Sequence, residues 1–285
     1  MRMSRITRIS SLGRMISPRN SATAWALSTS LVIGVFAGYS HGADSGIRGG
    51  VAAFLAWAIV RELAPQRALA SLLAPLAAIA FAIPAESDLL ACSGVLLAAR
   101  IAARTVGAAP TLLDCMLLVP LAGYLAMRPE GLPVALVLAA VVFADAPPAR
   151  LRWTGLVALA ATMVVGSLEG TLIVRTGWDD PVLAEQILLA LTLVAALALI
   201  AWPLPHRLAL TDDRGREQLH GPRIRMARIV TFASVAAAML WTGVDGAFAL
   251  SSAGAALLAA GLGGLGVHSA SDTLAAERTD EGSRG

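Results

Sequence analysis

The sequence contains no lysine, and its 22 basic residues are all arginine. Charged residues of every kind make up only 14% of the chain, whereas a soluble domain normally carries about 25%. We attribute the missing lysine to base composition and not to mechanism. The scarcity of charge, in contrast, argues against an ordinary soluble domain, and 57% of the residues are hydrophobic.

Cysteine and histidine are also scarce. The two cysteines, Cys92 and Cys115, lie within apolar segments, and the four histidines are scattered at segment ends. No CxxC motif is present, so the spacing favours neither a disulfide framework nor a metal site. We therefore expect no metal, no cofactor and no nucleic-acid partner.

Apolar sequence is abundant, in runs of about 15–24 residues separated by short charged segments, which is typical of a multi-pass membrane protein. Each run is expected to be a helix, because a helix satisfies its own backbone hydrogen bonds in a bilayer. The sequence therefore predicts an all-α, polytopic membrane protein with about ten transmembrane helices, eight or nine being the alternative. The predicted helices span residues 21–39, 47–61, 67–84, 88–104, 110–127, 132–146, 151–174, 181–203, 225–243 and 247–268.

The arginines are divided unevenly between the two sets of loops. With the N-terminus in the cytoplasm, ten helices place 19 arginines in inner segments and three, Arg48, Arg128 and Arg175, in outer loops. This bias satisfies the positive-inside rule. It predicts that both termini are cytoplasmic and that the protein is integral to the cell membrane, the inner or plasma membrane.

The segments outside the helices are small. Residues 1–20 form an arginine-rich arm, expected to lie on anionic lipid headgroups or to be a disordered tail; a signal or transit peptide is the alternative. Residues 21–268 are expected to form a single helical membrane domain with one inner loop, 204–228. Residues 269–285 are expected to be a disordered polar tail. None of these segments is large enough for a nucleotide-binding or catalytic domain, so any chemistry takes place within or at the edge of the membrane.

Residues 99–114, ARIAARTVGAAPTLLD, set charges among apolar residues. Helix capping explains them: Arg100 and Arg104 end one helix, and Thr111 with Asp114 forms a capping box at the start of the next. The alternative is a basic pocket on the cytoplasmic side for a phosphate or an anionic lipid headgroup. The candidate residues of that pocket are Arg61, Arg100, Arg104 and Arg152, balanced by Asp114 and Asp145.

Two glycine motifs are interpreted as helix-packing surfaces. GLGGLG at 261–266 matches the dinucleotide fingerprint, but that motif works only between a strand and a helix, and here it lies inside an apolar tract. Gly34 and Gly38 form a GxxxG pair in the first predicted helix. Both motifs allow close approach of neighbouring helices.

Glu169 and Glu185 lie within two consecutive predicted helices. Each is eight residues from residue 177, so an antiparallel hairpin turning there would bring both to a similar depth, about 6–8 Å inside the helix ends. They are candidates for a proton or cation site that opens to the outside, and they would share a proton if they faced each other. The alternative is a pair of interfacial glutamates that reach for headgroups.

The sequence favours a secondary transporter or permease for a small solute, coupled to protons or cations through these glutamates. Ten helices divide into five plus five, and an odd number per half gives inverted topology, a common transporter plan. In length and helix count the chain resembles the drug/metabolite transporter superfamily, although it carries no motif of that family. A scaffold or accessory subunit of a membrane complex is the first alternative. An enzyme acting on lipid-linked substrates at the cytoplasmic face is the second, for which no catalytic motif is found.

Overall fold

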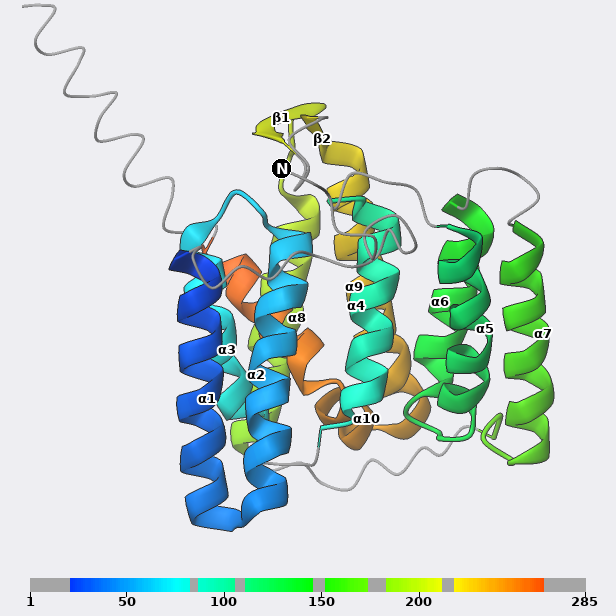
Figure 1. Cartoon of the computed structure of the whole chain (residues 1–285), viewed down its shortest axis with the longest axis horizontal. Coiled ribbons are helices and arrows are strands. Elements are labelled where there is room, and N and C mark those ends of the chain that lie inside the picture. The colour runs from blue at the N-terminus through cyan, green and yellow to red at the C-terminus, as the bar shows by residue number, and fades with distance from the viewer. Residues whose placement is uncertain are drawn as a thin grey trace, which may run out of the picture.

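The computed structural model describes residues 21–82, 87–105, 111–145, 152–173, 183–211 and 218–263. Within these ranges the chain is helical apart from one small β-hairpin, which confirms the predicted helical class. The predicted arm, 1–20, and tail, 269–285, lie outside the described residues. The elements are α1 (Ser21–His41), α2 (Ala43–Leu63), α3 (Ala68–Ala82), α4 (Leu89–Ala103), α5 (Leu112–Ala126), α6 (Leu132–Asp145), α7 (Arg152–Leu168), α8 (Leu183–Ala201), β1 (Arg207–Thr211), β2 (Gln218–His220), α9 (Gly221–Thr242), α10 (Val244–Ala249) and a last helix, Ser251–Gly263, which has no label in Figure 1.

Four helices, α1, α2, α8 and α9, are long and apolar enough to cross a membrane. The other apolar helices are shorter. For example, α4 has 15 residues, which is about 22 Å against a hydrocarbon core of about 30 Å. Figure 1 nevertheless shows short helices such as α4, α5 and α6 standing beside the long ones with similar axis directions.

The first two helices form a tight antiparallel pair. Gly42, with φ at 95°, makes the turn between them, so α2 begins earlier than the sequence predicted. A Cβ on Gly46 would lie 2.7 Å from the carbonyl oxygen of Gly34 and 2.8 Å from the Cα of Gly38. The predicted packing role of the GxxxG pair is thereby confirmed.

The last predicted helix, 247–268, is broken. Its first part is α10, and the last helix starts after Leu250, whose carbonyl accepts from the N–H groups of Ala253 and Gly254. A Cβ on Gly261 would lie 2.6 Å from the carbonyl oxygen of Ala195 in α8. The described part of the glycine motif, 261–263, therefore packs against neighbouring helices, as predicted, and residues 264–266 lie outside the described residues.

The predicted inner loop 204–228 is shorter than expected and partly ordered. In it β1 and β2 pair antiparallel, with Arg207 opposite His220, and α9 begins at Gly221 with a proline in its first turn. Residues 212–217 of this loop lie outside the described residues.

The bundle has two distinct ends. We call the end that carries the β-hairpin the hairpin end, and the opposite one the far end (Figure 1). Because the helices alternate in direction, α2, α4 and α8 finish at the hairpin end, while α3, α5, α7 and α9 start there. Most described arginines, Arg61, Arg67, Arg100, Arg104, Arg152, Arg223, Arg225 and Arg228, therefore lie toward the hairpin end, whereas Arg48 and Arg128 lie at the far end.

Candidate functional site

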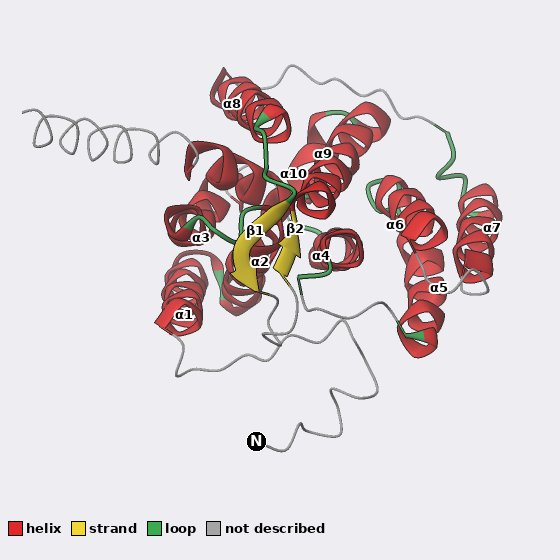
Figure 2. Cartoon of the chain, turned by 90° about the horizontal axis from the view of Figure 1, so that it is seen from above, coloured by secondary structure: helices red, strands yellow, loops and turns green. Residues whose placement is uncertain are grey.

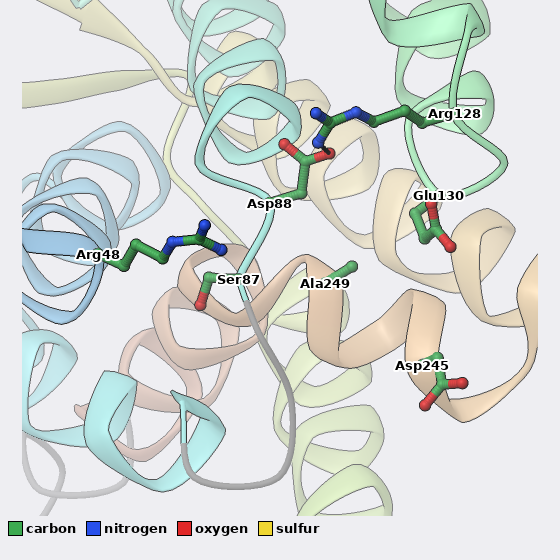
Figure 3. A pocket seen from close by; sticks show the side chains of 7 residues that line it. All are labelled: Arg48, Ser87, Asp88, Arg128, Glu130, Asp245 and Ala249. Atoms are coloured by element: carbon green, nitrogen blue, oxygen red, sulfur yellow. Dashed lines mark hydrogen bonds and ion pairs between the residues drawn. The ribbon is translucent and has the colours of Figure 1, made fainter. Parts of the chain in front are cut away.

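A cavity of about 230 Å³ lies at the far end of the bundle (Figure 3). Five of its seven lining side chains are charged, although charge is rare in this chain. They come from α2, the segment before α4, the turn between α5 and α6, and α10. The lining residues are Arg48, Ser87, Asp88, Arg128, Glu130, Asp245 and Ala249.

Asp88 organises one wall of the cavity. It is the N-cap of α4, and its Oδ1 accepts from the backbone N–H groups of Leu90 and Ala91, both at 3.0 Å. Its Oδ2 accepts from Nη1 of Arg128 at 3.3 Å, and Figure 3 marks this ion pair. The Asp88 carboxylate raises the pKa of the Arg128 guanidinium. An anionic cap at a helix N-terminus is favourable because it satisfies free N–H groups and complements the helix dipole.

The floor of the cavity lies at the break between α10 and the last helix. The Ala249 carbonyl accepts from the N–H of Asp88 at 2.9 Å and from Sγ of the buried Cys92 at 3.7 Å. The hydroxyl groups of Ser87 and Ser251 are hydrogen-bonded to each other. These contacts fix the start of α4 against the broken helix, and broken helices are typical of solute sites in membrane transporters.

The remaining charges lie on two sides of the cavity. Arg48 pairs with Asp44 one turn earlier in α2, through an Nε–Oδ2 contact of 3.0 Å. Figure 3 shows Arg48 near Ser87 on one side, and Glu130 and Asp245 on the other, with Ala249 between. Neither Glu130 nor Asp245 forms an ion pair with another residue that the structure describes.

At the hairpin end, the described residues include a buried polar network. The Glu62 carboxylate has no exposed surface and accepts from Nε of Arg100 at 3.1 Å and from the hydroxyl of Thr105. These residues join the C-terminal ends of α2 and α4. A buried carboxylate is tolerable here because an arginine and a hydroxyl both satisfy it.

Two further arginines join the ends of three helices. Arg228, fully buried in α9, donates from Nε to the Leu63 carbonyl of α2 at 2.9 Å and from Nη1 to the Leu199 carbonyl of α8 at 2.7 Å. Arg67 donates to the Ala260 carbonyl of the last helix at 2.8 Å and lies 5.3 Å from the ring centroid of Trp202. Cations are favourable at helix C-termini, where carbonyls lack intrahelical partners.

The structure does not bring Glu169 and Glu185 together. Figures 1 and 2 place α7 and α8 on different sides of the bundle, so the predicted hairpin between them does not form. Glu169 is also exposed and lies just beyond the end of α7, because the helix stops before Gly170, which has φ at 69°. Glu185 is half-buried in the first turn of α8. Both lie at the far end, at a similar level but apart.

The candidate basic pocket is divided as well. Arg61, stacked on Trp57 at 5.5 Å, Arg100 and Arg104 lie at the ends of α2 and α4. Arg152 starts α7, on another side of the bundle. The capping box of Thr111 and Asp114 is present, which confirms the capping interpretation of that turn. Asp145 ends α6, but its side chain lies outside the described residues.

Sequence reasoning missed the residues that carry both polar ends. Glu62 was overlooked although it is an acid beside an arginine at the end of an apolar run. Asp88 carried a usable pattern, a cap residue directly before an apolar helix. Nothing in the sequence distinguishes Arg48 and Arg128 beyond their outer-loop positions, or Asp245 beyond its place between two predicted helices.

The far-end cavity can admit a small polar solute, whereas the charged side chains Glu62, Arg67 and Arg228 of the hairpin end are buried against other protein groups. Among the described residues, no three His, Cys, Asp or Glu side chains are grouped so that they could hold a metal ion. No protein family matches this chain, nor does any curated protein or any solved structure.

Proposed function

We propose that this chain is a secondary transporter or permease that moves a small solute across the cell membrane. In this proposal ten helical segments cross the bilayer, namely α1 to α9 and the broken helix made of α10 and residues 251–263. The arginine-rich hairpin end faces the cytoplasm together with both termini. The short helices would be matched by local thinning of the bilayer. Anionic lipid headgroups would contact the arginines of the hairpin end.

The observation that carries the proposal is the contrast between the two ends of an apolar bundle. The far end has a charged cavity at a helix break. Below it the core consists largely of alanine and other apolar residues, and at the hairpin end the charges are buried in contacts with each other and with helix ends. A cavity open to one side and closed to the other is what one state of an alternating-access transporter requires.

Coupling to protons or cations remains part of the proposal. Glu169 and Glu185 lie at the same end as the cavity but on separate helices, so we treat them as two independent candidate carboxylates and not as a pair sharing one proton. Anionic lipid headgroups could bind at separate sites formed by the basic residues Arg61, Arg100, Arg104 and Arg152.

The test blocks the cavity after folding. In a Cys92→Ala, Cys115→Ala background, the Ser87→Cys variant is reconstituted into vesicles and treated with a bulky thiol reagent. Uptake of an isotope-labelled mixture of amino acids, organic acids, amines and sugars is measured by mass spectrometry. Tyr39→Cys, an exposed position near the end of α1, at the same end of the bundle but outside the cavity lining, is the matched control.

We expect at least one solute to accumulate above protein-free vesicles, and its uptake to fall at least tenfold after labelling of Ser87→Cys but not of Tyr39→Cys. Equal uptake before and after labelling would contradict the role of the cavity. If no solute accumulates, the transporter proposal fails and the scaffold becomes the favoured function.

A further inference from the structure

We infer that the far-end cavity binds a small zwitterion, a solute that carries an ammonium group and a carboxylate on one short skeleton. The inference deepens the proposed function and rests on it for its biological meaning. Binding itself, however, can be measured without transport.

The charges that line the cavity do not favour a plain anion or a plain cation. Asp88 and Arg128 neutralise each other, and Asp88 is further occupied by two backbone N–H groups. Glu130 and Asp245 then remain as carboxylates without an ion pair among the described residues, and they repel an anion. Arg48 forms an ion pair with Asp44, but the two side chains are 42% and 79% exposed, so solvent screens this pair. The charge of Arg48, on the opposite side of the cavity, therefore still disfavours a cation.

The same charges complement a molecule that has both signs. Arg48 holds Asp44 through Nε and makes further contacts, and a guanidinium with five donors can share them with a carboxylate in the cavity. The hydroxyl of Ser87 lies on the same side (Figure 3). Glu130 and Asp245 provide acceptors for an ammonium on the other side, and the small side chain of Ala249 leaves space between the two.

The size of the cavity sets the size of the ligand. A volume of about 230 Å³ corresponds to roughly eight water molecules at about 30 Å³ each. A solute of that size is comparable to a small amino acid. The headgroup of a zwitterionic phospholipid has the same two charges and is the second possible source of this chemistry.

The test compares two zwitterions, which differ in the spacing of their charges, with an anion and a cation of similar size. The purified full chain, in nanodiscs of phosphatidylglycerol, is titrated calorimetrically with L-alanine, γ-aminobutyrate, propionate and ethylamine. We expect one of the two zwitterions to bind at least tenfold more tightly than propionate and ethylamine. Nanodiscs that contain phosphatidylethanolamine separate the sources: competition by this lipid assigns the site to a headgroup, and undiminished binding assigns it to a free solute.

Two variants test the two sides of the cavity. Arg48→Gln should weaken binding of the zwitterion at least tenfold and should not weaken binding of ethylamine. Asp245→Asn should weaken binding of the zwitterion and should not weaken binding of propionate. Arg225→Gln, an exposed arginine of α9 toward the hairpin end, is the control for folding and surface charge. Propionate or ethylamine binding as tightly as both zwitterions, or equal loss in all three variants, would overturn the inference.

The inference and the transport proposal can fail separately. If the zwitterion binds selectively but is not taken up into vesicles, the binding site is supported and the transport proposal is overturned. Uptake that is blocked at Ser87→Cys without preference for zwitterions would retain transport and overturn the ligand class.

Discussion

Glu62 and Arg228 are charged side chains without exposed surface, and both belong to the hairpin end. Their partners differ in kind. Glu62 faces Arg100 and Thr105, whereas Arg228 donates to carbonyls at the ends of two other helices. Because buried charge is costly unless it is satisfied, these contacts determine which helix ends meet, and the loss of one partner would leave the other charge buried without compensation.

The Glu62→Gln variant should be less stable than the parent by about 3 kcal/mol, because it leaves Arg100 buried beside a neutral group. The free energy of unfolding in mixed detergent micelles measures this. Asp44→Asn is the matched control: Asp44 pairs with Arg48 but is 79% exposed, and an exposed pair of this spacing contributes at most about 0.5 kcal/mol. Equal losses in the two variants would show that the buried pair has no special role.

Single residues were predictable from sequence only where their partners are local. Thr111 and Asp114 are three residues apart, so the capping box follows from the motif alone. Glu62 and Arg100 are 38 residues apart, and their contact depends on how α2 and α4 are rotated about their axes. The sequence does not specify that rotation, because apolar residues cover all faces of these helices.

At the scale of elements, the helices were predictable because apolar runs are long and punctuated by charge. The ends of the helices were less predictable than the helices themselves. For example, α7 stops before Gly170, and the tenth predicted helix breaks at Leu250. The hairpin expected between α7 and α8 is wrong, since α7 packs beside α5 and α6 and α8 beside α9. Adjacency in sequence gives adjacency in space only when a short turn enforces it, as Gly42 does for α1 and α2.

The close contact of α1 with α2 depends on glycine. Gly46→Ala should destabilise the protein by about 1–3 kcal/mol, because the new methyl group would meet backbone atoms of Gly34 and Gly38, which cannot rotate away. Gly123→Ala in α5 is the control, with nothing within 4 Å of the added Cβ; alanine there should be neutral or stabilising by up to about 1 kcal/mol. Unfolding free energies in mixed micelles compare the two, and equal effects would contradict the packing role of the glycine pair.

At the scale of the whole molecule, the separation of α7 from α8 changes what the two glutamates can do. If Glu169 and Glu185 act as independent coupling groups, Glu169→Gln and Glu185→Gln should each lower solute uptake driven by a proton gradient. Their effects in the double variant should multiply, because distant sites contribute additively in free energy. A double variant no worse than either single one would indicate a shared proton and contradict the separation seen in the structure. Folding should be unaffected by Glu169→Gln, whose side chain is exposed.

The number of membrane crossings decides how the whole bundle sits in a bilayer. Single cysteines are introduced into a Cys92→Ala, Cys115→Ala background and treated in intact cells with a membrane-impermeant thiol reagent. If all ten helical segments cross, Met127→Cys, at the end of α5, lies outside and is labelled, and Pro205→Cys, after α8, lies inside and is protected. If only the four long helices cross, the result is reversed, since α3 to α7 would then stay on the cytoplasmic side and α8 would end outside.

Two further positions serve as controls in this experiment because both topologies place them alike. With a cytoplasmic N-terminus, Asp44→Cys at the α1–α2 turn should be labelled, and Gln66→Cys before α3 should be protected until the cells are permeabilised. Labelling of Gln66→Cys together with protection of Asp44→Cys would show that the protein has the opposite orientation in the membrane. That result would contradict the positive-inside assignment. We expect Asp44→Cys and Met127→Cys to be labelled and Gln66→Cys and Pro205→Cys to be protected, since only then do the charged cavity and the buried arginine network face opposite sides of the membrane.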